Sequence, residues 1–222
     1  MSQLDQLLLN FKFRKNYDKN DFFVSSSNFY AFTLVDTWPN WEKNIINICG
    51  ERYCGKTHLA EIFLKKNKGK LINLKTENIK NLNDLRLFEN IVIDNFDKNI
   101  DENYIFTLFN FVDQNNKYLL INSEKPINEI NFDLADLNSR AKNCLIAKID
   151  KPDDELIKVL LSKSFSDRQI IINNKLIDFI AKRIARSYGK IFEFIYKIDE
   201  MSLKKKKSIN LKTIKEVLGV LN

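Results

Sequence analysis

The feature that most constrains this chain is a loop at residues 50–57 with the sequence Gly-Glu-Arg-Tyr-Cys-Gly-Lys-Thr. It matches the pattern G-x-x-x-x-G-K-[ST], directly follows the apolar run 45–49 and directly precedes a helical pattern. Its glycines let the loop bend so that N–H groups face phosphate oxygens, and the helix start adds a partial positive charge. A chance match in an ordinary turn is the alternative, and this context disfavours it.

The same loop predicts how a nucleotide is held. We expect Lys56 to place its positive charge on the outer phosphates of ADP or ATP, and Thr57 to offer its hydroxyl to Mg²⁺. His58 follows in the first turn of the helix, where packing or a local hydrogen bond is the favoured role and a nucleotide contact is the alternative. The nucleotide-binding residues predicted here are Gly50, Cys54, Gly55, Lys56, Thr57 and His58.

A second part of the site is predicted at the end of another strand. The run Ile-Val-Ile at residues 91–93 ends in Asp94, whose carboxylate would complete the magnesium shell; an ordinary turn aspartate is the alternative. In hydrolysing proteins of this class the next residue is usually acidic, to orient and polarise the attacking water. Here it is Asn95, which can hold a water but cannot accept its proton. We therefore expect weak or absent intrinsic hydrolysis, with Asp97 as the nearby carboxylate that keeps the alternative open.

Short apolar segments alternate with helical patterns between residues 44 and 149. Strands are predicted at residues 44–49, 70–74, 91–94, 118–122 and 144–149. Helices are predicted at residues 56–66, 81–88, 102–115 and 134–141, and a short one precedes them from residue 29 to the Trp38-Pro39 pair. This alternation predicts an α/β fold with a mostly parallel sheet and helices on both faces.

After Pro152 the pattern becomes helical throughout. Pro152 suits the first turn of a helix, and the three carboxylates that follow it favour the positive end of the helix dipole. Helices are predicted at residues 153–165, 175–186, 190–203 and 211–221. We therefore predict a flexible N-terminal segment at 1–20, a nucleotide-binding α/β domain at 21–150 and a helical lid domain at 151–222.

Charge and hydropathy narrow the class of protein. The formal net charge of +7 favours contact with polyanions, but the lysines are scattered and only residues 204–207 form a run. A solvated loop is the favoured interpretation of that run, and a DNA contact is the alternative. The chain has neither an apolar stretch of about 20 residues, as a membrane span requires, nor a signal peptide at its start. We expect a cytoplasmic protein without a membrane partner.

Cysteine and histidine exclude further classes. Cys49, Cys54 and Cys144 are odd in number and lack the short spacing of zinc or redox sites, so we interpret them as reduced, small apolar residues. A catalytic triad or a Cys-His mechanism would need the single histidine, which stands next to Thr57 in the phosphate loop. This position argues against such chemistry.

Three segments of the chain carry a resemblance to a known family: the phosphate loop continued by His-Leu, the run Ile-Val-Ile-Asp-Asn at 91–95, and the segment Leu-Asn-Ser-Arg at 137–140. By these segments the chain resembles the AAA+ module of the bacterial replication initiator DnaA. The resemblance covers nearly the whole chain and implies an AAA+ P-loop sheet flanked by helices, followed by a small all-helical lid. Segments 21–24 and 27–28 resemble the part that packs near the adenine. The residues this implicates are Phe23 and Val24 near the base, and Asn122 and Ser123, together with Asn95, as sensor or water-positioning residues.

DnaA continues into a helix-turn-helix domain, whereas this sequence ends with the expected lid. Together with the asparagine after Asp94, this makes the chain more similar to the Hda group of DnaA-related regulatory inactivators. The resemblance implies a regulator of replication initiation that stimulates hydrolysis of DnaA-bound ATP, with DnaA as its partner. Arg140 stands where the family places an arginine finger, which neutralises charge on a neighbouring molecule's phosphate; a surface salt bridge is the alternative.

The family's lid arginine, which senses the nucleotide, is replaced by Gly189 in this sequence. Lys190 lies beside it and Arg186 one turn earlier. A lid that senses bound ATP poorly is consistent with a protein that works in an ADP-bound state.

Residues 6–11, Gln-Leu-Leu-Leu-Asn-Phe, resemble the Q-L-x-L-x-[LF] peptide by which such proteins dock onto the sliding clamp of DNA polymerase III. Gln6 would enter a polar pocket, and Leu9 and Phe11 an apolar one, with Leu7 as a further contact. The alternative is that leucines 7–9 cover the protein's own core. Docking implies association with the nucleoid through the clamp, with DNA contacted only indirectly or weakly.

Two other classes of function compete with this reading. A DNA-remodelling AAA+ ATPase, such as a helicase loader or a DnaA-like initiator paralogue, would contact DNA directly and hydrolyse ATP itself. A small-molecule P-loop kinase is disfavoured by the helical lid and by the arginine at position 140. Assembly with further copies of the same chain is compatible with either AAA+ reading.

Overall fold

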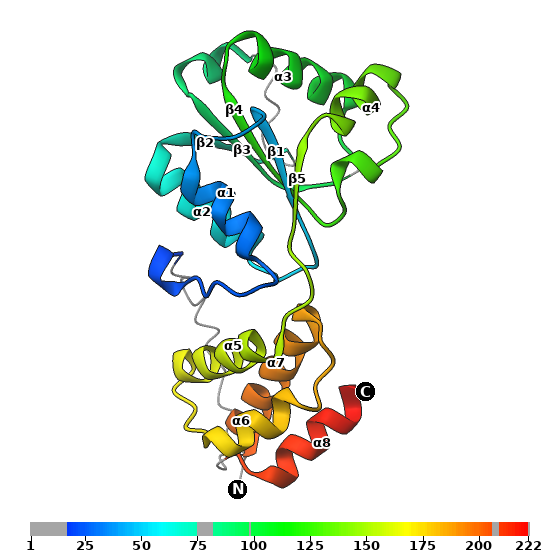
Figure 1. Ribbon diagram of the computed structural model, residues 1–222. Coiled ribbons are helices and arrows are strands. Elements are labelled where there is room, and N and C mark those ends of the chain that lie inside the picture. Colours follow the sequence, from blue (N-terminus) through cyan, green and yellow to red (C-terminus); the bar gives the residue numbers. More distant parts are fainter. Residues whose placement is uncertain (1–16, 75–81, 98, 206–208, 222) are drawn as a thin grey trace, which may run out of the picture.

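The computed structural model describes residues 17–74, 82–97, 99–205 and 209–221. They form a five-stranded sheet flanked by helices and, beyond one edge of this sheet, a separate group of helices (Figure 1). The predicted α/β fold with an all-helical C-terminal region is confirmed. The peptide predicted to dock on the clamp, at residues 6–11, lies outside the described residues.

All five strands are parallel, in the order β2-β3-β4-β1-β5. They are β1 (Ile45–Cys49), β2 (Gly69–Ile72), β3 (Asn90–Phe96), β4 (Tyr118–Ser123) and β5 (Leu145–Lys148). Each predicted strand is present, with small shifts at its ends. Because β1 lies inside the sheet and the chain leaves it for the far edge strand β2, the loop after β1 sits where the strand order reverses, which is where α/β sheets bind ligands.

Helices cover both faces of the sheet. They are α1 (Phe29–Thr37), α2 (Lys56–Asn67), α3 (Glu102–Gln114) and α4 (Ala135–Lys142). Successive side chains of β3 serve opposite faces: Val92 belongs to the apolar cluster that contains Phe63 of α2, whereas Ile91 and Ile93 belong to the cluster that contains Phe109 of α3. Burial on both sides explains why these strands are continuous apolar runs rather than alternating ones.

Three short 3₁₀ helices complete this part of the chain: η1 (Lys19–Asp21), η2 (Leu82–Leu87) and η3 (Ile127–Glu129). The helix predicted at residues 81–88 was therefore wrong in type. The carbonyl oxygens of Arg86 and Phe88 accept hydrogen bonds from the buried ammonium group of Lys117, at 2.9 and 2.7 Å. These carbonyls thus bind Lys117, which directly precedes β4, instead of continuing the hydrogen bonding of a helix.

The C-terminal helices, called the lid below, are α5 (Asp154–Asp167), α6 (Asn174–Ala181), α7 (Tyr188–Lys205) and α8 (Leu211–Leu221). They enclose an apolar cluster of their own, which includes Phe165, Ile180 and Phe194. The helix predicted at residues 175–186 ends earlier, at Ala181. The physical reason is that the chain must leave α6 to form the cap of the next helix. In this cap the Ser187 hydroxyl accepts a hydrogen bond from the N–H of Lys190, at 3.3 Å.

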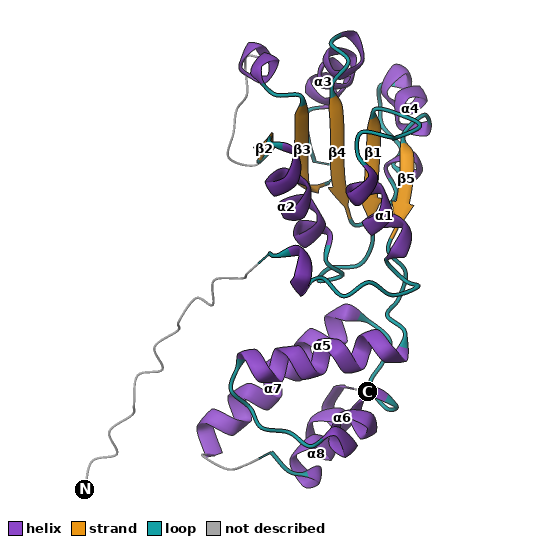
Figure 2. Ribbon diagram, turned by 60° about the vertical axis from the view of Figure 1, so that its left-hand side comes forward, coloured by secondary structure: helices purple, strands orange, loops and turns teal. Residues whose placement is uncertain are grey.

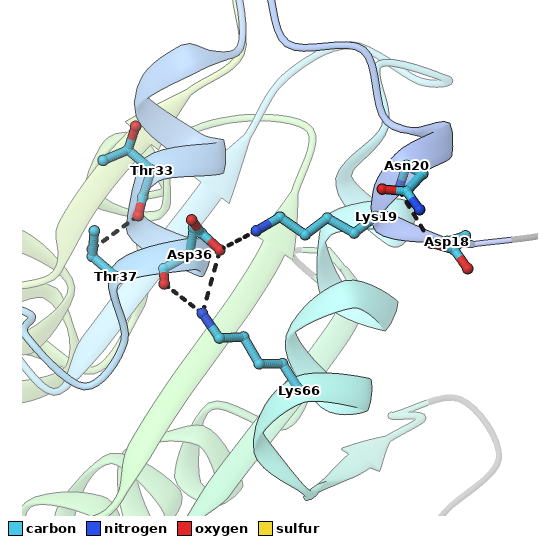
Figure 3. Close-up of polar contacts among 7 residues, drawn as sticks. All are labelled: Asp18, Lys19, Asn20, Thr33, Asp36, Thr37 and Lys66. Atoms are coloured by element: carbon cyan, nitrogen blue, oxygen red, sulfur yellow. Dashed lines mark hydrogen bonds and ion pairs between the residues drawn. The ribbon is translucent and has the colours of Figure 1, made fainter.

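The carboxyl ends of the strands point toward the lid (Figure 2). A segment at residues 17–28 runs between the sheet and the lid and is fixed to the helices beside it. Asp36 at the end of α1 accepts from Lys19 at 2.6 Å and from Lys66 of α2 at 3.3 Å (Figure 3). Within the described part of the chain, the helices lack the length and apolar composition that crossing a membrane requires.

Candidate nucleotide-binding site

The loop at residues 50–57 connects β1 to α2 and depends on both of its glycines. Gly55 precedes α2 with a φ of 103°, a conformation that side chains rarely adopt, and a Cβ there would lie 3.0 Å from the Phe22 ring. A Cβ at Gly50 would lie 2.9 Å from the carbonyl oxygen of Ile149. The backbone is therefore packed closely enough on both sides to require glycine at the two positions that the motif prescribes.

Lys56 is buried at the centre of this loop. Its ammonium group donates hydrogen bonds to the carbonyl oxygens of Gly50 at 2.7 Å and Glu51 at 2.9 Å. The loop thus concentrates a full positive charge next to the amino end of α2, where N–H groups and the helix dipole favour an anion. This arrangement suits the phosphates of a nucleotide.

The three cysteines behave as small buried residues. Burial raises the pKa of Cys54 in the phosphate loop, although the ammonium of Lys56 lies 3.7 Å from its sulfur. Burial also raises the pKa of Cys49 to about 11 and that of Cys144 to about 12. All three side chains therefore stay protonated thiols at neutral pH, in agreement with their predicted role.

Thr57 and Asp94, the two residues predicted to hold magnesium, meet each other and two of the predicted sensor residues. Asp94 at the end of β3 accepts from the hydroxyl of Thr57 at 2.9 Å and from the amide of Asn122, on β4, at 2.9 Å. Asn95 donates to the same carboxylate at 3.3 Å. The side-chain oxygen of Asn122 is buried and has no hydrogen-bond partner among the residues that the structure describes. It is therefore an acceptor that a bound ligand or water would satisfy.

Asn95 and Ser123 also have local structural roles. Asn95 has a φ of 58°, in the left-handed region that asparagine tolerates better than most residues. The Ser123 hydroxyl accepts from the amide of Asn47 at 2.9 Å and donates to the carbonyl of Lys125 at 2.5 Å. Ser123 therefore shapes the turn after β4 while it lines the cavity described next.

A cavity of about 1020 Å³ lies between the phosphate loop, the 17–28 segment and the lid. Its size is at the upper end of ordinary ligand sites, which suits a nucleotide with its metal ion. Its lining includes Phe22 and Phe23 but not Val24, so of the two residues implicated near the base only Phe23 borders this cavity. Leu156 and Leu160 of α5 add apolar surface that would cover a base.

His58 fastens the 17–28 segment beside this cavity. Its Nε2 lies 2.8 Å from the carbonyl oxygen of Asp18, and its ring meets the rings of Tyr17 and Phe22 edge-on. Burial lowers the pKa of His58, which keeps the imidazole neutral at pH 7. The structure thus contains the favoured role of this residue, packing with a local hydrogen bond, and His58 lines the cavity as well.

The residues present fit a magnesium nucleotide. Among the described residues no three His, Cys, Asp or Glu side chains gather into a metal site. Thr57 and Asp94 would therefore hold the ion together with oxygens of the nucleotide, as is usual for Mg²⁺, and the ion would neutralise phosphate charge.

Sequence reasoning missed the three residues after Gly50, because the motif leaves these positions open. In the structure each has a partner from elsewhere in the chain. Arg52 forms an ion pair with Glu124, after β4, at 2.5 Å. The rings of Tyr53 and Phe192, on α7, are stacked with centroids 4.3 Å apart. Glu51 binds the start of α7.

Arg140 lies at the opposite edge of the sheet. Its guanidinium pairs with Asp113 at 2.6 Å, and the amide of Asn44, just before β1, donates to the same carboxylate at 2.9 Å. β1 has five residues, so its first and last Cα atoms are separated by about 13 Å at roughly 3.3 Å per residue. Arg140 is therefore remote from its own phosphate loop, and its predicted role toward another molecule stays a prediction.

The two cations that lie near Gly189 in the sequence have partners within the lid. Arg186 pairs with Asp154 at 3.0 Å, and Lys190 with Glu193 at 3.3 Å. Lys163 of α5 does line the cavity, where it pairs with Asp21 at 2.7 Å.

Sequence comparison relates the chain to DnaA at low identity. No family model matches it. It is 27% identical over 190 residues to an uncharacterized protein of Haemophilus influenzae, covering 78% of this chain and 80% of that protein. It is 26% identical over 228 residues to DnaA of Caldanaerobacter subterraneus subsp. tengcongensis, covering 91% of this chain. The chain spans only 52% of that DnaA, about half its length.

Structure comparison identifies the fold. Domain III of DnaA from Thermotoga maritima superposes with a TM-score of 0.74 at 20% identity, covering 92% of this chain and 96% of that domain. AMPPCP-bound DnaA from Aquifex aeolicus superposes with a TM-score of 0.67 at 19% identity, covering 90% of this chain and 69% of that one. The chain therefore has the AAA+ fold of DnaA domain III.

Proposed function

We propose that this chain is a nucleotide-binding regulator of DNA replication initiation. Docked on the DNA-loaded sliding clamp, it stimulates hydrolysis of the ATP bound to DnaA and so inactivates the initiator. The observation that carries the nucleotide part of this proposal is that Lys56 and Thr57 line the cavity and that Thr57 is hydrogen-bonded to Asp94, which in turn accepts from Asn122. The AMPPCP-bound DnaA that shares this fold supports ADP or ATP as the ligand.

A role as regulator rather than motor is supported by the residue next to Asp94. The side chain of Asn95 donates to that carboxylate, and an amide cannot accept a proton from water. A protein with weak hydrolysis of its own can still affect a partner's nucleotide by supplying a positive charge to it.

Arg140 is the residue we assign to that charge. It lies about the length of a strand away from its own phosphate loop, so its guanidinium would contact the nucleotide of another molecule and not its own. The Asp113 carboxylate and the Phe106 ring, whose centroid lies 5.5 Å from the guanidinium carbon, hold it at the surface. DnaA is the partner that the sequence resemblance favours.

The test is phosphate release from ATP-loaded DnaA, with and without this protein, in the presence of ADP and of clamp loaded on DNA. We expect stimulation, its loss on deletion of residues 1–11, and its loss in Arg140→Ala with nucleotide and clamp binding retained. Known trans-acting arginines contribute about 10³ to 10⁵ in rate. Lys142→Ala is the matched control, because it removes a cation from the same last turn of α4. Unchanged stimulation by Arg140→Ala would contradict the assignment.

The alternative is a DNA-remodelling ATPase, such as a helicase loader or a DnaA-like initiator paralogue. The specific observation in its favour is Asp97, a carboxylate that lines the cavity two residues after Asn95. No stimulation of DnaA, combined with DNA-stimulated hydrolysis by the chain alone, would favour this function over the regulator.

A further inference from the structure

The central strand β1 carries an asparagine, Asn47, among apolar residues. Its side chain is fully buried, and the residues before and after it, Ile46 and Ile48, belong to the apolar cluster on the α2 side of the sheet. Because successive side chains of a strand point to opposite faces, Asn47 points to the α3 side, where Ile45 belongs to the apolar cluster. A buried amide costs free energy unless its polar atoms are hydrogen-bonded. The partners of this amide are therefore what stabilises it in the core.

The amide of Asn47 is bound by the end of β4 and by the turn that follows it. Its nitrogen donates to the carbonyl oxygen of Ile121 and to the hydroxyl of Ser123, both at 2.9 Å. Its oxygen accepts from the backbone N–H of Ile127, also at 2.9 Å. Both hydrogens of the amide nitrogen are thus used. One side chain of β1 therefore fixes the chain at three points between residues 121 and 127.

Asn122 lies between two of these partners. Ile121 and Ser123, the residues on either side of it, are both held by the amide of Asn47. Because side chains alternate along a strand, Asn122 points to the opposite face of the sheet from these two neighbours. There its own amide donates to the carboxylate of Asp94 at 2.9 Å. Asn47 thus holds the backbone from which the Asn122 amide reaches that carboxylate.

This arrangement concerns magnesium because Asp94 is one of the two protein groups that would hold the ion. A side chain that hydrogen-bonds to a metal ligand fixes the orientation of the ligand, and its loss typically costs about 10- to 100-fold in metal affinity. Asn122 binds the Oδ1 atom of the Asp94 carboxylate, and the hydroxyl of Thr57 binds its Oδ2 atom. The direction of the Asn122 amide therefore helps to set the orientation in which the carboxylate would meet the ion.

We infer that Asn47 is a positioning residue for the magnesium nucleotide site. It acts through Asn122: by fixing both neighbours of that residue, it keeps the Asn122 amide directed at the Asp94 carboxylate. The inference rests on the proposed nucleotide site and deepens it. Asn47 is fully buried, so its influence on the ligand passes through its hydrogen-bond partners. This role also accounts for an amide at a core position whose neighbours are isoleucines.

The test is the ratio of the Kd for ADP in EDTA to the Kd for ADP in Mg²⁺, in the full chain and in Asn47→Leu. Leucine suits the apolar surroundings and removes the amide. We expect the ratio to fall about fivefold, less than the loss of a direct partner of a metal ligand causes. The matched control is Asn90→Leu, which removes a fully buried asparagine from the amino end of β3. It should leave the ratio within about twofold of the wild type.

A double-mutant cycle separates positioning from a general effect on the fold. Asn122→Ala alone should lower the same ratio by about tenfold, since it removes the direct partner of Asp94. Adding Asn47→Leu to Asn122→Ala should lower the ratio no further, because Asn47 acts through the amide that is already lost. If Asn47→Leu fails to fold, Asn47→Ala removes the same amide without inserting a branched side chain and replaces it in the cycle.

The outcomes separate the inference from the proposed function. An unchanged ratio in either single variant overturns the inference, and so does the full effect of Asn47→Leu in the Asn122→Ala background. An equal loss of affinity in Mg²⁺ and in EDTA overturns it too, because it marks a purely structural effect. A wild type that binds ADP equally well in Mg²⁺ and in EDTA overturns the inference and leaves the nucleotide site intact. Failure of the wild type to bind ADP or ATP would contradict the nucleotide part of the proposed function, and the inference with it.

Discussion

At the scale of single residues, Lys56 shows how much of the site is local. The motif predicts a cation at this position, and the structure buries that cation against the carbonyl oxygens of Gly50 and Glu51. Its charge is thus kept inside the loop, where solvent screens it little. A group in such surroundings contributes strongly to the binding of an anion.

We predict that Lys56→Ala lowers the affinity for ADP and for ATP by at least about tenfold, since a hydrogen bond to a charged group contributes about 1.5–3 kcal/mol. Titration calorimetry with Mg²⁺ measures this change. The control is Lys66→Ala at the other end of α2, which removes an exposed ion pair with Asp36. Wild-type affinity in Lys56→Ala would mean that the loop is not the phosphate site.

Asn95 illustrates what a residue identity leaves open. The sequence indicates an amide where hydrolysing relatives of the P-loop class carry an acid. The structure adds a positive φ of 58°, which favours asparagine for backbone reasons that have nothing to do with water. The residue therefore has a conformational role in addition to the chemical one proposed for it.

At the scale of elements, the start of α5 is built by its cap. The Asp153 carboxylate accepts from the N–H of Leu156 at 2.8 Å and from the hydroxyl of Ser26 at 3.0 Å, so it also ties the lid to the 17–28 segment. Burial opposes ionisation of this group, but these hydrogen bonds outweigh burial and hold the pKa of Asp153 below its ordinary value of 3.8.

We predict that Asp153→Ala lowers the free energy of unfolding by about 1 kcal/mol, the usual contribution of a helix cap. Because the folded-state pKa is lowered, the stabilisation from ionised Asp153 is fully present above the unfolded pKa near 3.8, declines below it and is lost as the pH falls through the lower folded-state pKa. Urea unfolding at pH 7 and at pH 3 measures both effects. Asp153→Asn is the matched variant: it keeps a capping oxygen and should lose little stability at pH 7. A loss in Asp153→Ala that does not diminish between pH 7 and pH 3 would contradict this assignment.

At the scale of the whole molecule, the lid and the sheet are joined by few apolar residues. The lid has its own apolar cluster, separate from the two clusters on the faces of the sheet, and Leu156 and Tyr188 are lid residues that pack into the sheet cluster on the α2 side. Polar ties, such as Asp21 with Lys163, add to this junction. The cavity lies between the two parts, so a ligand in it would contact both.

We predict that ADP with Mg²⁺ slows amide hydrogen exchange at the starts of α5 and α7 more than in the interior of the lid. A ligand at a concentration of about 100 times its Kd stabilises the folded protein by about 2.7 kcal/mol. Amide exchange that requires the ligand to dissociate first would therefore be up to about 100-fold slower. Mass spectrometry of exchanged peptides measures this, with the α8 peptides as an internal control. Equal protection throughout the lid would contradict a ligand site at the junction.

The sequence by itself determined the architecture and the centre of the site. Strand and helix patterns depend on residues close together in the sequence, and Gly50, Gly55 and Lys56 belong to one continuous motif. Both could therefore be predicted without knowledge of the fold. The meeting of Thr57, Asp94 and Asn122 was also predictable, because carboxyl ends of parallel strands lie at one edge of a sheet.

Only the tertiary structure decided how the loop and the lid are joined. Glu51 and Tyr53 occupy positions that the motif leaves open, and their partners on α7 lie more than 130 residues away. The early end of α6 and the pairing of Arg140 with Asp113 belong to the same class. Such contacts follow from how whole elements pack. A side chain at a position that no motif constrains interacts with whichever residue packing brings next to it, and its neighbours in the sequence do not determine which residue that is.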